Sequence, residues 1–91
     1  MTSYTWDEKK RLSNLRKHGL DFANASAVFA GRTFTTEDTR VRYGERRFIT
    51  IGHFAGREVA VTYTERNDDI RIISFRKANR EERETLFIYG R

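Results

Sequence analysis

The chain has 91 residues, no cysteine and a formal net charge of +5, from 18 lysine and arginine against 13 aspartate and glutamate residues. This length fits one domain over residues 1–91 with a small core, and the lack of cysteine excludes disulfides and thiolate metal sites. No apolar run approaches the roughly 20 residues that span a bilayer, and the N-terminus lacks a secretory signal, so we expect a cytoplasmic protein with no membrane contact.

Arginine carries most of the positive charge, because only four of the 18 basic residues are lysine. Its planar guanidinium group binds phosphate through two hydrogen bonds at once, which a lysine ammonium group cannot do. The composition therefore favours a polyanionic partner, such as nucleic acid, an acidic protein or an anionic membrane. The alternative is a charged surface that only keeps the protein in solution.

The first third of the chain predicts two helices after a short strand or apolar lead-in at residues 4–6. Asp7 is a good N-cap for a helix that ends near Lys17, where a cation, His18 and Gly19 form a strong stop signal. Asp21 is a second N-cap, and apolar residues recur at helical spacing over residues 22–30. The short link between the two segments predicts a helical hairpin.

The rest of the chain predicts strands and one final helix. Strand patterns cover residues 46–54, 57–66 and 70–77, and more weakly 32–38. The short links at 55–56 and 67–69 predict an antiparallel meander. Asn79 and Glu82 have capping-box spacing before a helix over 80–89, whose apolar residues are expected to dock on the sheet, namely Leu86, Phe87 and Tyr89. The predicted fold class is α+β, with helices mainly on one face of an antiparallel sheet.

The two hairpins are expected to gather charged residues at the two ends of the sheet. A two-residue turn places Arg46 opposite Glu65, and the next turn places Arg66 opposite Ile70 or Arg71. One end then collects Glu45, Arg46, Glu65, Arg66 and Arg71, and the other collects His53, Arg57, Arg76, Lys77 and Arg80. A single exposed Arg–Glu pair contributes little to stability. Arginine at this density along strands favours an anion that neutralises the repulsion.

Cleavage of RNA needs cations that stabilise a pentavalent phosphate and groups that transfer protons. The plausible proton carriers are His18, Glu45, Glu65 and His53. His18 is equally explained as a cation at a helix C-terminus, and His53 as a solvated residue near a hairpin tip. The aromatic residues that could stack on bases are Tyr43, Tyr63, Tyr89 and Trp6, although Trp6 at a helix start is more typical of a core residue.

Motifs for other chemistry are missing from the sequence. The two histidines lack metal-ligand spacing. There is no glycine-rich phosphate loop, no Ser–His–Asp or Cys–His set and no dinucleotide fingerprint. We therefore expect no metal and no cofactor.

Short matches along nearly the whole chain resemble the BrnT family of toxins. They are Trp6-Asp7, Lys10, Asn14, Lys17-His18-Gly19, Phe22, Glu45-Arg46, Ile51-Gly52, Gly56-Arg57, Tyr63-Thr64-Glu65-Arg66, Ile70-Arg71-Ile72-Ile73-Ser74, Arg76-Lys77-Ala78 and Glu82-Arg83. The resemblance implies a RelE-like fold and a ribonuclease toxin of a type II toxin–antitoxin system that arrests growth. It also implies a hetero-oligomer with a BrnA-like ribbon-helix-helix antitoxin, through which the toxin reaches operator DNA and represses its own operon. The chain departs from the family pattern at Leu86, where we expect a tyrosine.

The leading hypothesis from the sequence is an endoribonuclease that needs no metal. Arg66, Arg71 and Arg76 would hold phosphate in a shared cradle, and His18 or Glu45 would move protons. RNA would also contact the remaining basic residues of the family pattern and its surroundings, namely Lys10, Lys17, Arg46, Arg57, Lys77, Arg80 and Arg83. The alternative hypothesis is a non-catalytic basic module that binds nucleic acid or an acidic protein.

Overall fold

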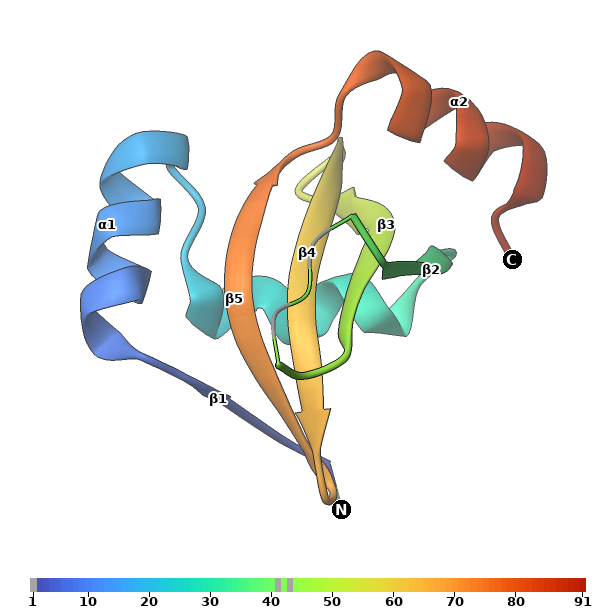
Figure 1. Cartoon of the computed structure of the whole chain (residues 1–91). Helices are drawn as coiled ribbons and strands as arrows, with labels where there is room; N and C mark the ends of the chain where they lie inside the picture. The colour runs from blue at the N-terminus through green and yellow to red at the C-terminus, as the bar shows by residue number, and fades with distance from the viewer. Residues whose placement is uncertain (1, 41, 43) are drawn as a thin grey trace.

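A computed structural model describes residues 2–40, 42 and 44–91 and has one five-stranded sheet with three helical segments. The sheet order is β1-β5-β4-β3-β2 (Figure 1). The strands are β1 (Ser3–Trp6), β2 (Phe34–Asp38), β3 (Arg47–Phe54), β4 (Arg57–Arg66) and β5 (Asp69–Lys77). The predicted α+β class is therefore confirmed, and both weakly predicted strand segments are strands.

Strands β3, β4 and β5 form the predicted antiparallel meander, with Phe48 opposite Tyr63 across the first hairpin. The sheet as a whole is mixed, because β1 pairs with β5 in the parallel direction, with Thr5 opposite Arg71. The expectation of a purely antiparallel sheet is thus wrong. A strand joined by a short turn must reverse direction, whereas β1 is separated from β5 by most of the chain and is free of that constraint.

The predicted register of the second hairpin is wrong by one residue at its tip. Arg66 lies opposite Asp69, and the ladder has an irregularity at Thr62/Tyr63 that shifts the pairing along β4 and β5. A bulge adds one residue to one strand and cannot be counted from turn length. Arg46 also falls outside the ladder, because β3 begins at Arg47.

The helical segments begin and end at the predicted signals. Helix α1 (Glu8–His18) is capped by the Asp7 carboxylate and ends at Gly19, which adopts a positive φ of 71°. Helix α2 (Arg80–Tyr89) begins with the predicted capping box of Asn79 and Glu82. No helix in the described part of the chain is long and apolar enough to cross a bilayer.

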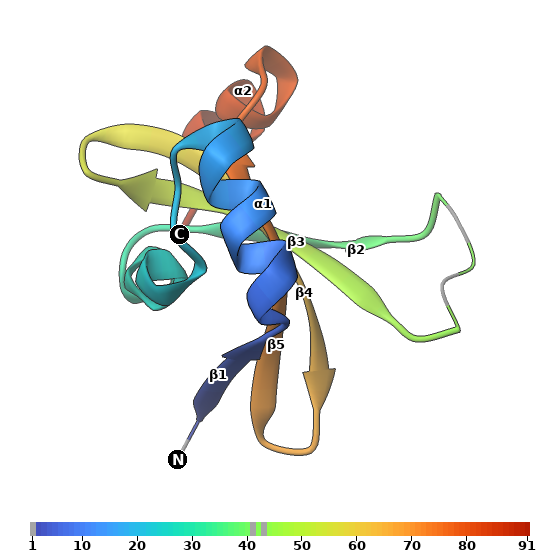
Figure 2. The ribbon, with the colours of Figure 1, turned by 90° about the vertical axis from the view of Figure 1, so that its left-hand side faces the viewer.

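The predicted amphipathic helix over 22–30 is instead a 3₁₀ helix, η1 (Phe22–Ala30), capped by Asp21. The helical hairpin is also wrong, because η1 crosses behind the sheet while α1 runs along its side (Figures 1 and 2). Apolar spacing alone does not separate the two helix types, and small residues such as Ala25 let η1 lie close to the strands.

Helices cover both faces of the sheet, not mainly one as expected. On the first face, η1 closes a core that contains Phe22, Val28, Val61, Ile72 and Phe75. On the second face, the open face, α2 packs a small second cluster at one end of the sheet, where Leu86 contacts Ile51 and Ala78. Leu86, where the resemblance leads us to expect a tyrosine, is therefore a buried packing residue. Phe87 is 79% exposed, so its predicted docking is wrong. Tyr89 is partly docked, because its ring lies 5.9 Å from that of Phe34 on β2, between centroids, although 62% of the residue is exposed.

Asn14 shields the free edge of β5, where β1 has already ended. Its side chain donates to the backbone oxygens of Phe75 (2.7 Å) and Leu20 (3.1 Å) and accepts from the Phe75 N–H (3.2 Å). We expect Asn14→Ala to lower the free energy of unfolding by about 1–3 kcal/mol, because these backbone groups lose their partner. Urea unfolding tests this, with Ser13→Ala on the exposed neighbour as control. Equal stabilities of the two variants would refute the role.

Candidate active site on the open face

Strand alternation places two of the predicted arginines on the open face of β5. Phe75 points into the core, so Arg76 points to the other face and lies opposite Ala60. Arg71 lies between the core residue Ile72 and its neighbour Ile70, and it therefore also points to the open face. Hydroxyl residues lie between them on the same face, at Thr62 and its partner Ser74.

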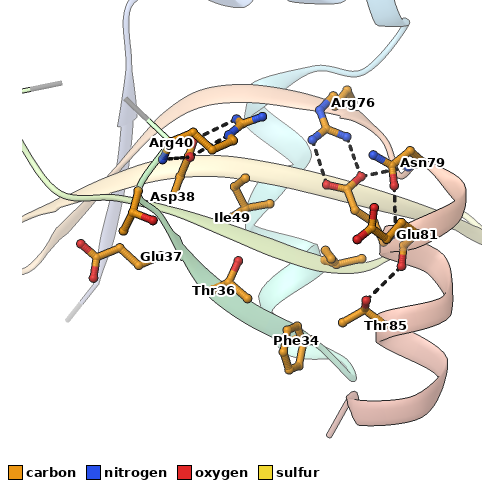
Figure 3. Close-up of a pocket in the computed structure, with 13 residues that line it drawn as sticks. Phe34, Thr36, Glu37, Asp38, Arg40, Ile49, Arg76, Asn79, Glu81 and Thr85 are labelled. Carbon is orange, nitrogen blue, oxygen red and sulfur yellow. Dashed lines mark hydrogen bonds and ion pairs between the residues drawn. The ribbon is translucent and has the colours of Figure 1, made fainter. Parts of the chain in front are cut away.

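Arg76 borders a pocket of about 370 Å³ between the sheet and the first turn of α2 (Figure 3). Phe34, Ile49 and Ile51 give the pocket an apolar strand side. The segment that follows β2 closes one end, and α2 closes the other. The polar lining consists of Thr36, Glu37, Asp38, Thr39, Arg40, Arg76, Asn79, Glu81, Glu82 and Thr85.

Two guanidinium groups at the rim of this pocket are each fixed by a carboxylate. Arg76 makes two hydrogen bonds with Glu82, at 2.8 and 2.9 Å. Arg40 makes two with the buried Asp38, at 2.9 and 3.0 Å. The charges of the two arginines interact. Glu82 raises the pKa of Arg76, and the positive charge of Arg40 opposes that rise. Both planar groups are thus held in place before any ligand binds.

Glu82 holds both Arg76 and the start of α2, through hydrogen bonds from the Arg76 guanidinium group and the Asn79 N–H. Burial alone would raise the pKa of its carboxyl group, but hydrogen bonds from Arg76 and from the Asn79 N–H lower the pKa overall. The carboxylate therefore stays ionised and fixes Arg76 and the start of α2 together. A sequence reading identifies Glu82 only as a helix cap.

The charge of Arg76 also reaches His18, the last residue of α1. His18 has a pKa below its usual value, because burial disfavours its charged form and because Lys17 and Arg76 repel a further positive charge. His18 lines a shallow groove between α1 and β5 with Lys10, Lys17 and Ser74 among others. Most of its population is therefore neutral at pH 7, which is the form of a general base.

The other predicted catalytic residues lie at the far end of the sheet. Glu45 is ion-paired with Arg66 at 3.3 Å and lies 3.9 Å from Arg47. Arg71 is partly exposed, and its side chain has no hydrogen-bond or ion-pair partner among residues 2–40, 42 and 44–91. About 16 Å of strand separates the Cα atoms of Arg71 and Arg76, at 3.3 Å per residue.

The predicted RNA-binding residues are divided between several surfaces. Arg46 pairs with Glu37 at 2.9 Å and lies over the ring of Phe48, whose other contacts are with the core. Arg80 pairs with Glu84 on α2, and Arg83 donates to the Ala78 carbonyl. Arg57 and Lys77 are exposed and lie on the face that η1 covers, opposite Phe54 and Val59.

The expected single cradle of guanidinium groups is therefore wrong. Four of the seven predicted arginines are paired with nearby carboxylates, and the seven lie on both faces of the sheet. Of the aromatic residues expected to stack on bases, Tyr63 is only 5% exposed and cannot do so. Tyr43 lies outside the described residues. Sequence reasoning missed Arg40, whose only signal was its spacing of two from Asp38.

Within the described residues, no three histidine, aspartate or glutamate side chains gather in a way that would hold a metal ion. The chemistry that the open face offers is that of fixed guanidinium groups, a neutral imidazole and hydroxyl groups.

Comparison with known proteins confirms the resemblance seen in the sequence. Residues 6–82 match the family described as "Ribonuclease toxin, BrnT, of type II toxin-antitoxin system". The structure is similar to the 1.1 Å crystal structure of the Brucella abortus ribonuclease toxin, BrnT, with 32% sequence identity and a TM-score of 0.65 over 88% of this chain and 99% of that chain. No curated protein sequence matches the chain. The chain therefore belongs to the BrnT family of ribonuclease toxins of type II toxin–antitoxin systems.

Proposed function

We propose that this protein is an endoribonuclease that cleaves RNA on the open face without a metal ion. The observation that carries the proposal is Arg76 on the open face, fixed by two hydrogen bonds to Glu82 at a pocket that Arg40 also lines. The charge of Arg76 also acts on the imidazole of His18. Family membership supports the reaction type. Arg71 would hold a second phosphate farther along β5, because its distance from Arg76 is too large for one phosphate to contact both.

In this mechanism the 2′-hydroxyl of the RNA is the nucleophile. His18 accepts its proton while the 2′-oxygen bonds to phosphorus, and the bond from phosphorus to the 5′-oxygen breaks. The leaving 5′-oxygen takes a proton from solvent water, and the products are a 2′,3′-cyclic phosphate and a 5′-hydroxyl group, with the 2′-hydroxyl proton held on His18 until solvent removes it. Arg76, with Arg40, stabilises the extra negative charge on the pentavalent phosphorane. Glu45, with its partner Arg66, is the alternative proton carrier and would require the reaction to occur at the other end of the sheet.

The pH dependence of cleavage separates these two carriers. The pKa of His18 lies below 6.5, so kcat/KM should rise with pH through an inflection below 6.5 and level off by pH 7. His18→Gln should lower kcat/KM by about 100-fold or more and remove this acid limb. If His18→Gln keeps the wild-type dependence of kcat/KM on pH, His18 is not the proton carrier. Glu45→Gln would then be expected to lower kcat/KM instead. Thermal unfolding checks that both variants fold.

The activity itself is tested by incubating the purified protein, free of any antitoxin, with single-stranded RNA in excess chelator. Cleavage to cyclic-phosphate ends is expected. Intact RNA at high protein concentration would reject the enzyme and favour the alternative, a basic module that binds nucleic acid or an acidic protein without cutting. That module would still show binding that weakens steeply with salt.

The proposal extends to the cell. Family membership implies an antitoxin protein; we propose a BrnA-like ribbon-helix-helix protein that forms a hetero-oligomer with the toxin and carries it to the operator of its own operon. Expression of the toxin alone should arrest growth, through cytoplasmic RNA, and co-expression of the antitoxin should relieve the arrest. We also infer kinship of the fold with RelE-like toxins.

A further inference from the structure

The pocket beside Arg76 has a lining whose charge is opposite to that of the molecule as a whole. Four carboxylates and two guanidinium groups line it, so its net charge is negative although the chain carries +5. The carboxylates repel a phosphate from the interior, and the two guanidinium groups attract one to the rim. An RNA that binds here must therefore keep its backbone at the rim and place a base inside.

The shape and the walls of the pocket suit a single base. Its volume of about 370 Å³ is within the roughly 300–1,000 Å³ of small-molecule sites. Phe34 and Ile49 offer an apolar surface on the strand side, and the guanidinium planes of Arg40 and Arg76 lie at the rim (Figure 3). Unstacked RNA bases bind proteins through such apolar surfaces and guanidinium planes.

One carboxylate in the pocket is available to a ligand. Asp38 and Glu82 are each held by an arginine, and Glu37 pairs with Arg46. Glu81, on the α2 side of the pocket, receives no side-chain hydrogen bond or ion pair from any residue that the structure describes. A free carboxylate has two acceptor oxygens and no donor. It therefore selects a ligand edge with two adjacent N–H donors.

We propose that this pocket binds a guanine base of single-stranded RNA, with the Glu81 carboxylate accepting hydrogen bonds from N1–H and the N2 amino group. Guanine has two adjacent donors on its Watson–Crick edge, whereas adenine, cytosine and uracil each have an acceptor beside their donor. This inference rests on the proposed function for its substrate class. It adds a preference for cleavage next to guanosine, set by Glu81 as a specificity-determining residue.

Inosine tests the proposal, because it lacks only the N2 amino group of guanosine. Dissociation constants are measured at one salt concentration for two short RNAs that differ only by guanosine or inosine at a single position, and cleavage of both is followed separately. The wild-type protein should bind the guanosine RNA about 10- to 100-fold more tightly, because inosine loses one of the two hydrogen bonds to a charged acceptor. Glu81→Gln, which replaces one acceptor by a donor, should abolish this preference.

Glu84→Gln is the matched control, because Glu84 is also on α2 but pairs with Arg80 and does not line the pocket. It should keep the preference. Equal binding of the two RNAs by the wild type, or an unchanged preference in Glu81→Gln, would overturn the proposal. A guanosine preference in binding without any cleavage would instead reject the proposed enzyme and leave the base pocket supported.

Discussion

Replacing Arg76 by alanine is expected to lower the rate of RNA cleavage by about 100- to 1,000-fold, the loss typical when a donor to a developing negative charge is removed. Its guanidinium group is fixed by Glu82, whereas Arg40 is held by Asp38, so Arg40 does not take its place. The measurement is kcat/KM on a short RNA. Arg16→Ala is the matched control, because Arg16 is exposed on α1 and lines no pocket that includes Arg76, so its rate should stay near the wild-type value.

Arg76→Ala can lower activity either by removing a group that acts on the RNA or by weakening the fold through the loss of the Arg76–Glu82 ion pair, so the two effects must be separated. Arg76→Ala leaves the half-buried Glu82 without its partner and is expected to destabilise the fold moderately. The double variant Arg76→Ala/Glu82→Gln removes the unpaired charge and keeps a side chain that can cap α2. It should unfold at a higher temperature than Arg76→Ala and remain inactive. Recovery of activity in the double variant would show that Arg76 acts only on stability.

Replacing Phe75, the residue before Arg76, by alanine should lower the stability of the fold strongly, because Phe75 points to the core face of β5. Phe75 is fully buried and packs edge-on against Phe54, with ring centroids 5.7 Å apart. Phe75→Ala removes most of a core side chain and leaves a cavity, which costs about 3–5 kcal/mol. A domain of this size has about 5–15 kcal/mol of total stability. We therefore expect a large population of unfolded protein at moderate temperature.

Urea and thermal unfolding measure this loss. Phe87→Ala is the control with the same change of residue, because Phe87 is exposed on α2, and its effect should stay within about 0.5 kcal/mol. A loss below about 1 kcal/mol in Phe75→Ala would mean that β5 is not the centre of the core. Together, the variants at 75 and 76 test whether the residues on the core face of β5 determine stability and those on its open face determine catalysis.

The elements of this fold follow local rules, and the sequence predicts them well. Asp7, Gly19 and the pair Asn79–Glu82 mark helix ends through contacts within a few residues. The β3–β4 register follows from the length of one tight turn. In each case the physical cause lies within the segment, so the pattern predicts the structure.

The prediction of the site was less complete, because a site depends on which faces the elements cover. Arg46 and Arg71 were both placed at the same end of the sheet, but the prediction did not give their faces: Arg46 lies over Phe48 on the face that η1 covers, and Arg71 lies on the open face. A bulge in the β4–β5 ladder and the position of β3 decided this difference. Arg40 and Glu81 had no pattern of their own and gained a role only from the pocket that they line.

By itself, the sequence determined the order and ends of most elements, the basic character of the protein and its membership of the BrnT family, because these depend on composition, spacing and short motifs. Only the tertiary structure decided that β1 pairs in parallel with β5, that α2 packs at one end of the open face, and that Arg76 shares a pocket with Arg40 and acts on the charge of His18. The reason is physical: contacts between residues far apart in the chain depend on how the apolar faces pack together, and the charged residues take the positions that this packing leaves to them.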